Sequence, residues 1–169
     1  MPVFQVTVSQ RDAQDDSQET TQRLYFLRGH ALNVEHVARI SQTLLADPVT
    51  ELWAIGQPGV PEAGHTIEIT FLPGVTDSVA ENLVRAAEEL GLPALEEAAS
   101  GMRVIVRGDA DPARLHDLAR ARFANEVIQR YVIDQPIPPP FTSLVSGDSD
   151  RVETIALSGA DDDALLAIS

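Results

Sequence analysis

The chain has 169 residues, 44% of them hydrophobic, and carries 12 basic against 26 acidic side chains for a net charge of −14. This length allows one domain or two small subdomains, and the apolar runs are far shorter than the roughly 20 residues that cross a membrane. The acidic balance disfavours nucleic acid as a partner because a phosphate backbone would be repelled. The absence of cysteine excludes disulfides, thiolate nucleophiles and cysteine-bound metals. The start, MPVFQVTV, lacks the pattern of a secretory signal, so we expect a cytoplasmic protein with no membrane partner.

The order of elements predicts three stretches: residues 1–56, residues 64–134 and residues 135–169. A linker rich in proline and glycine, GQPGVPEAGH at 56–65, separates the first two. We expect the first two stretches to be folded modules of similar design.

The first stretch predicts two strands joined by a connector. Residues 3–8 alternate apolar and polar side chains, which is typical of a half-buried strand. Residues 11–22 show no apolar periodicity and indicate a solvated connector, and RLYFLRG at 23–29 predicts the second strand.

A helix and a third strand are expected to complete this stretch. Asn33 can cap a helix whose apolar side chains recur every three or four residues: Val34, Val37, Ile40, Leu44 and Leu45. Pro48 ends this helix because proline disfavours helical geometry in the residue before it, and residues 49–55 predict a strand.

The second stretch begins with a strand and a helix. TIEITF at 66–71 alternates as a strand does. Thr76 or Ser78 can cap the following helix, with Glu81 placed for a capping box and Gly91 for the C-terminal end. The apolar face of this helix is Val79, Leu83, Ala86 and Leu90.

Three further strands and a second helix are expected in this stretch. Residues 95–98 and 102–108 predict two separate strands, and residues 127–133 predict the last one. Asp111 and Pro112 can start the helix, whose inward side chains are Leu115, Leu118, Ala119 and Phe123.

The two stretches align as a repeat. LLADPVTELWAI at 44–55 matches RFANEVIQRYVI at 122–133, so that Trp53 aligns with Tyr131 as an aromatic residue at one strand position. The first stretch has no counterpart of the helix at 76–91 and its following strand, so we expect its module to be incomplete. Two strand–helix–strand units predict an α+β fold of ferredoxin-like character, with antiparallel sheets, four strands in the complete module, and helices on one face.

One sheet face is then expected to need a partner surface, either the other module or another chain. Its outward residues should include some of Tyr25, Leu27, Ile105, Ile128 and Val132. Trp53 and Tyr131 are our candidates for an interface between modules or with a partner.

The third stretch predicts a proline-rich linker and the start of a following domain. Three consecutive prolines at 138–140 favour an extended segment. Residues 152–169 indicate a short strand and a capped helix of about two turns, which is marginal without further packing.

No motif in the chain indicates a catalytic, cofactor-binding or metal-binding residue. The histidines at 30, 36, 65 and 116 do not have the spacing of a metal-binding pair. LPGVTDS at 72–78 leads into a helix, where free backbone amides can hold an anion, but a tight turn is the commoner meaning. From its residues alone the chain is an accessory or interaction module.

The second stretch resembles PurS, the small component of phosphoribosylformylglycinamidine synthase in purine biosynthesis. The family's P-G-V-x-D turn is matched by Pro73, Gly74, Val75 and Asp77. Its short box before the last strand, leucine or alanine followed by asparagine, proline and valine, is matched by Ala124, Asn125, Val127 and Ile128, with Glu126 in place of the proline. The first stretch keeps Pro48 but has Asp47 for the asparagine.

The end of the chain, VETIALSGADDDALLAIS, is similar to the segment by which the large component, PurL, enters its catalytic domain. Tandem PurS-like modules before such a segment resemble the N-terminal region of PurL chains with PurS fused to them. The resemblance implies a noncatalytic module of a glutamine-dependent ligase, bridging a PurL-type catalytic domain and a PurQ-type glutaminase for ammonia transfer. ATP and magnesium are implied for the catalytic partner and not for this chain, and homo-oligomers are possible. The alternative is a free-standing ferredoxin-like regulatory domain that binds a small effector.

Overall fold

The computed structural model describes residues 1–11, 18–61, 64–92 and 94–141. Half of the connector expected at 11–22 and the elements expected in 152–169 lie outside the described residues. Residues 19–22 already belong to the second strand, so the prediction of a connector up to residue 22 is wrong there. The helices and strands in chain order are β1 (Val3–Gln10), β2 (Glu19–Arg28), α1 (Val34–Ile40), β3 (Glu51–Ile55), β4 (Gly64–Phe71), α2 (Ser78–Glu89), β5 (Glu97–Arg107), α3 (Pro112–Leu118) and β6 (Gln129–Ile133). A π-helical turn extends α1 through Ser41–Leu45 and α3 through Ala119–Phe123.

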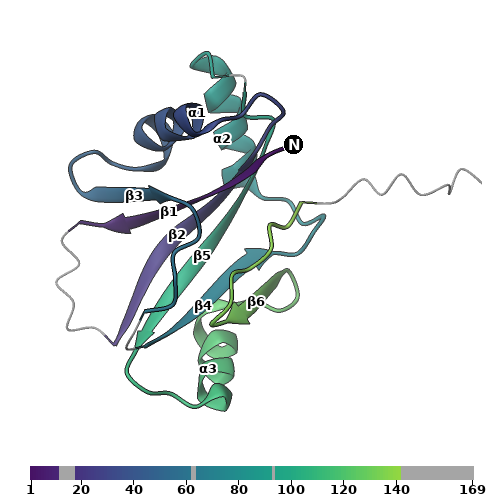
Figure 1. The fold of residues 1–169 in the computed structure, drawn as a ribbon. Coiled ribbons are helices and arrows are strands. Elements are labelled where there is room, and N and C mark those ends of the chain that lie inside the picture. Colours follow the sequence, from purple (N-terminus) through teal and green to yellow (C-terminus); the bar gives the residue numbers. More distant parts are fainter. Residues whose placement is uncertain (12–17, 62–63, 93, 142–169) are drawn as a thin grey trace, which may run out of the picture.

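The strands of the described residues form one six-stranded sheet in the order β3-β1-β2-β5-β4-β6, with every neighbouring pair antiparallel (Figure 1). This confirms an α+β fold with an antiparallel sheet, and it is compatible with a ferredoxin-like plan. Two separate strands at 95–98 and 102–108 are a wrong prediction, since both belong to β5. The weakly strand-forming residues between them are held because β5 pairs with β2 on one side and β4 on the other. Gly101 fits there because a Cβ would lie 2.5 Å from the Ile69 carbonyl oxygen.

The two halves of the sheet have the same order of strands and terminal helix. In each half two antiparallel strands precede a helix with a π-helical end and an outermost strand. The halves meet where β2 pairs with β5. When Arg28 is aligned with Arg107, Arg23 aligns with Met102, and these two residues lie opposite each other in the β2–β5 register. The two halves are therefore related by an approximate twofold axis through this residue pair.

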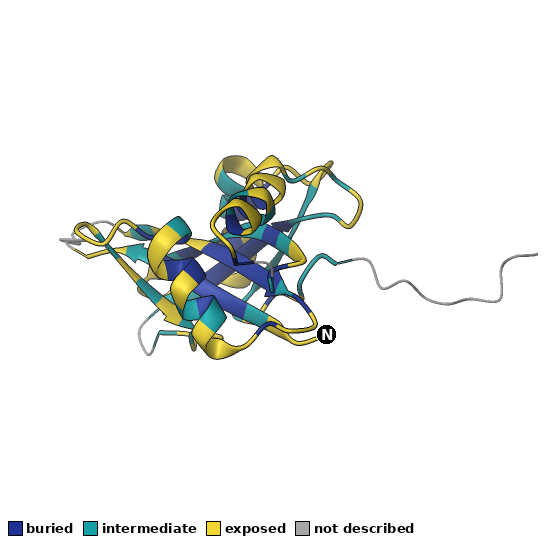
Figure 2. Ribbon diagram, turned by 90° about the horizontal axis from the view of Figure 1, so that it is seen from above, coloured by how far each residue is buried: buried dark blue, intermediate teal, exposed yellow. Residues whose placement is uncertain are grey.

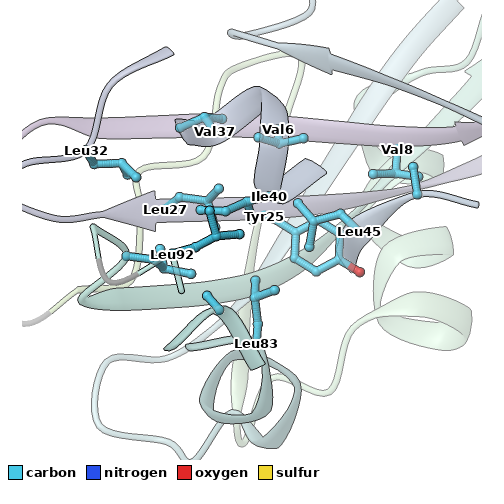
Figure 3. Packing of buried hydrophobic residues seen from close by; sticks show 13 residues of the cluster. Val6, Val8, Tyr25, Leu27, Leu32, Val37, Ile40, Leu45, Leu83 and Leu92 are labelled. Atoms are coloured by element: carbon cyan, nitrogen blue, oxygen red, sulfur yellow. The ribbon is translucent and has the colours of Figure 1, made fainter. Parts of the chain in front are cut away.

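One sheet face carries all three helices. Directly opposite residues of paired strands share a face, which places Val6, Tyr25 and Ser100 on the same side as Met102 and Val104. The larger core lies between this face and helices α1 and α2, with Ile40 and Leu83 directed toward Tyr25 and Leu27 (Figure 3). A smaller core packs Leu115 and Ala119 of the α3 region on Ile67, Ile69, Val104 and Val106. The outer sides of the helices are exposed (Figure 2).

Two extended segments of the chain cross the opposite face (Figure 1). We call residues 56–61 the crossing loop and residues 135–141 the strap. Ile137 of the strap is buried against Leu24, Phe26 and Ala99. The expectation that this face needs a separate partner surface is therefore wrong where the strap lies on it. Tyr25 and Leu27 lie on the helix face instead, Ile105 and Val132 lie on the strap face, and Ile128 precedes β6 and is exposed.

Side chains cap all three helices. Asn33 caps α1 and Asp111 caps α3, as predicted. The cap of α2 is Asp77, so the prediction of Thr76 or Ser78 is wrong. Asp77 occupies this position because its carboxylate also accepts hydrogen bonds from the backbone and hydroxyl of Ser100 in β5, at 2.6 and 3.0 Å. Of the apolar residues assigned to buried helix faces, Val34, Val79 and Leu90 are exposed, since the helices pack with only a narrow side on the sheet.

Candidate functional site

The two ends of the sheet carry the candidate residues. Trp53 lies in the middle of β3 and Tyr131 in the middle of β6, and both strands are outermost. Both side chains are half-buried on the helix face, Trp53 beside the larger core and Tyr131 beside the smaller one. Five strand spacings of about 4.8 Å separate their strands, roughly 24 Å. The structure therefore places them at opposite edges and does not combine them into one site.

The segment before each outermost strand is a duplicated hinge. In the first half the Asp47 carboxylate accepts hydrogen bonds from the backbone N–H of Val49 and Thr50, at 2.8 and 2.9 Å. In the second half the Asn125 side chain accepts one from the N–H of Val127 at 3.1 Å. These local bonds are typical of Asp and Asn in turns.

A second pair of hydrogen bonds closes both hinges. The N–H of Asp47 donates to the Glu51 carboxylate and the N–H of Asn125 donates to the Gln129 side chain, both at 2.9 Å. The aligned residues thus make equivalent bonds. The pKa of Asp47 is lowered from the ordinary aspartate value because its carboxylate accepts the backbone hydrogen bonds from Thr50 and Val49. The bond from Thr50 has the largest effect and the bond from Val49 the next largest.

The edge at Tyr131 has polar chemistry around the ring. His116 Nδ1 lies 2.9 Å from the Tyr131 hydroxyl, and the two rings meet edge to face with centroids 5.6 Å apart. The Arg120 guanidinium lies 3.3 Å from the Glu126 carboxylate. The negative charge of Glu126 is the main cause that raises the pKa of Arg120, and the interaction with Tyr131 is the next largest cause. In the first half Ala38 aligns with His116 and Gln42 with Arg120, so the edge at Trp53 lacks these groups. Sequence reasoning missed His116, although its place on the helix preceding the aromatic strand is a usable signal.

The P-G-V-x-D turn borders a hollow of about 600 Å³ between α2 and the start of β5. Its charged lining comprises Asp77, Glu81, Arg85, Glu96 and Glu97. The Asp77 carboxylate itself accepts the hydrogen bond of the Ala80 N–H at 3.0 Å, so it occupies one of the amides that an anion would use. This arrangement favours a tight turn over an anion site.

Glu96 at the rim of this hollow joins it to the loop before α1. Its carboxylate accepts the backbone N–H of His30 at 2.7 Å and lies 3.1 Å from the His30 ring nitrogen. Both hydrogen bonds lower the pKa of Glu96, and the bond from the His30 backbone has the larger effect.

The other two histidines each contact an oxygen atom of the protein. His65 Nδ1 lies 2.7 Å from Asp134 and His36 Nδ1 lies 3.1 Å from the Ala31 carbonyl oxygen. Among the residues that the structure describes, no group of three or more His, Asp or Glu side chains is placed to hold a metal ion.

No helix in the described parts of the chain is long and apolar enough to cross a membrane. A comparison with protein-family models finds no match, and a comparison with curated proteins finds none either.

Proposed function

We propose that this chain is a noncatalytic assembly module of phosphoribosylformylglycinamidine synthase, built of tandem PurS-like halves and acting in the cytoplasm. It bridges the ATP-dependent PurL-type catalytic domain and the PurQ-type glutaminase. The observation that carries the proposal is the duplicated hinge, which ends in two aligned outermost strands at opposite sides of one sheet. The resemblance of residues 73–77 and 124–128 to PurS supports purine biosynthesis as the pathway in this proposal.

The two edges are suited to binding two partners. An outermost strand has backbone N–H and C=O groups on its open side, which can pair with another chain. Within the described sheet, β3 pairs only with β1 and β6 only with β4. Two such edges about 24 Å apart allow one module to contact two other proteins at once.

Bridging has a chemical purpose in such an enzyme. Ammonia in neutral water is mostly protonated and is then not a nucleophile, so a glutaminase and a synthetase that share it must be held close together. The chain's role in this proposal is to hold them, and ATP and magnesium belong to the catalytic partner.

Reconstitution with the matching glutaminase and catalytic component tests the proposal. We expect the chain to co-elute with both proteins in size-exclusion chromatography and to raise glutamine-dependent turnover, while turnover with added ammonia changes little. Failure to co-elute, together with unchanged glutamine-dependent turnover, would overturn it. The elution volume of the chain alone also reports whether it forms homo-oligomers.

Substitutions at the two edges test which side contacts which protein. We expect Trp53→Ala and Tyr131→Ala each to weaken one of the two associations, with Val79→Ala on the exposed side of α2 as the control. If the double variant Trp53→Ala/Tyr131→Ala stays folded and assembles normally, the hinges only turn the chain and the edges are not the docking sites.

The second candidate function is a regulatory domain that binds a small effector. The 600 Å³ hollow beside α2 is the observation that favours it, since the volume is in the range of small-molecule sites. A thermal shift on adding amino acids or nucleotides, without any dependence on purine enzymes, would support this candidate over the assembly module.

A further inference from the structure

A buried ion pair lies at the centre of the strap face. Glu68 of β4 and Arg103 of β5 are directly opposite in the register, with a nitrogen–oxygen distance of 2.8 Å. Their side chains are only 2% and 3% exposed. Buried charges are costly unless each is paired and its remaining hydrogen-bonding groups are satisfied. Arg103 Nε has no hydrogen-bond partner among the described residues, so the contacts of the other polar atoms of the pair matter for the structure around it.

Each charged group holds one of the two crossing segments. Arg103 donates to the carbonyl oxygens of Pro58 and Gly59 in the crossing loop. Glu68 uses its second carboxylate oxygen to accept the backbone N–H of Ile137 in the strap, at 2.8 Å. The ion pair thus connects two segments that are far apart in the sequence.

The strap has few other polar attachments. Prolines at 136 and 138–140 have no N–H, so Ile137 supplies the donor at the buried centre of the strap. Arg130 donates to the carbonyl oxygen of Pro138 at 2.7 Å, and the Phe141 ring lies 4.2 Å from the Arg28 guanidinium carbon. Loss of the Ile137–Glu68 hydrogen bond would leave the strap held by apolar packing and by the contacts of Pro138, Pro139 and Phe141.

The start of the strap is also fixed. Asp134 has a positive φ of 54°, a left-handed conformation that aspartate adopts more readily than most residues other than glycine. Its carboxylate accepts the N–H of Thr66 at 2.8 Å and lies 2.7 Å from His65. The chain is therefore turned at a defined point before it crosses the sheet.

We propose that Glu68 and Arg103 form a latch that locks the strap onto the sheet and so fixes the path of the chain from Gln135 to Phe141. Glu68 is a positioning residue, because it acts through the Ile137 N–H. The latch stands apart from the proposed assembly function and holds whether or not that function is correct.

Thiol labelling of the full chain tests the latch, since the natural sequence has no cysteine. Ala99→Cys introduces a thiol beneath the strap, at a position that is 5% exposed, and Ala87→Cys introduces one on the helix face as the control. In the background Glu68→Leu/Arg103→Leu, which replaces both charges, we expect at least tenfold faster labelling of the Ala99→Cys thiol and an unchanged rate at Ala87→Cys. Unchanged rates at both positions in a folded protein, or equal increases at both, would overturn the latch.

A second pair of variants leaves the ion pair in place. Ile137→Pro removes the N–H that Glu68 binds, whereas Ile137→Ala shortens the side chain and keeps the N–H. The latch predicts faster labelling of Ala99→Cys in the Ile137→Pro protein, by several-fold relative to the Ile137→Ala protein. Equal rates would show that side-chain packing alone seats the strap and would contradict the proposal.

Discussion

The two halves of the sheet repeat one hinge, but they do not share the helix layer equally. Helix α2 joins β4 to β5 in the second half, yet its buried Leu83 and Ala87 belong to the core of the first half. Among the described residues that core contains 13 buried hydrophobic residues, against seven in the core beneath α3. The repeat in the sequence therefore does not mark two independent cores, and the second half completes the first.

The edges differ as well. Trp53 lies at an edge without charged neighbours on the preceding helix turn, whereas Tyr131 contacts His116 and lies near Arg120. One backbone plan thus presents two chemically distinct ends.

The largest effect is expected on dividing the chain. Residues 1–61 as a separate fragment should show no cooperative unfolding, because β2 loses its ten paired residues in β5 and the core loses Leu83, Ala87, Leu92 and Leu95. Circular dichroism and amide NMR dispersion would check this, and mixing with residues 64–141 should restore folded signals. A cooperative thermal transition of the 1–61 fragment alone would break the comparison, since the first half would then be self-sufficient.

The next largest effect is expected from α2. Leu83→Ala should lower the free energy of unfolding by about 2–5 kcal/mol, since a large buried side chain leaves a cavity. Leu90→Ala at the exposed end of the same helix is the matched control, with an expected change within about 0.5 kcal/mol. Urea unfolding measures both, and equal effects of the two substitutions would show that α2 does not anchor the core.

Tyr131→Phe should have a smaller effect. It removes the hydroxyl next to His116 in a partly exposed position, so we expect a loss of about 0.5–1 kcal/mol. Trp53→Phe keeps an aromatic ring at the aligned position and serves as the comparison. A Tyr131→Phe protein as stable as the parent would mean that the two edges differ in polarity but not in stability.

The smallest effect is expected from Asp47→Asn, which gives the first hinge the side chain type of the second. The pKa of Asp47 is lowered by the N–H groups of Thr50 and Val49, so its ionised form stabilises the fold above the unfolded-state pKa of about 3.9. This contribution is lost as pH falls through the lower folded-state value. The variant should be slightly less stable at pH 7, with the difference shrinking below about pH 4.

Thermal unfolding of both proteins between pH 7 and pH 3 measures that difference. The Asn125→Ala protein, altered at the neutral hinge, is the control, because its stability relative to the parent should not depend on protonation at that position. A pH-independent gap between the Asp47→Asn protein and the parent would contradict the assigned role of the carboxylate.

The local features could be predicted from the sequence. Asn33 and Asp111 cap helices through their own neighbours, and Pro48 marks the end of a helix before a strand, so each depends on a few adjacent residues. The alignment of Trp53 with Tyr131 likewise needed only the repeat. Such signals depend on backbone chemistry within one turn of chain.

The long-range features could not be predicted in this way. Glu68 and Arg103 alternate with apolar neighbours as solvent-facing strand residues do, but both are buried and bonded to the strap and the crossing loop. The sequence offers one signal for this burial. Ile137 is a large apolar residue between prolines, which is typical of an extended segment that packs on an apolar surface. The continuity of β5 and the packing of α2 on the first half likewise arise from pairing between segments that lie far apart in the sequence.

The approximate twofold axis at Arg23 and Met102 has a consequence for recognition. In a dimer of identical chains every substitution is present twice, so both ends must remain the same. Here both ends of the sheet belong to one chain, so a substitution at Tyr131 or His116 alters one end and leaves the end at Trp53 unchanged. The two ends of the sheet are therefore chemically different. A protein that binds only one of them is held in a single orientation relative to the sheet.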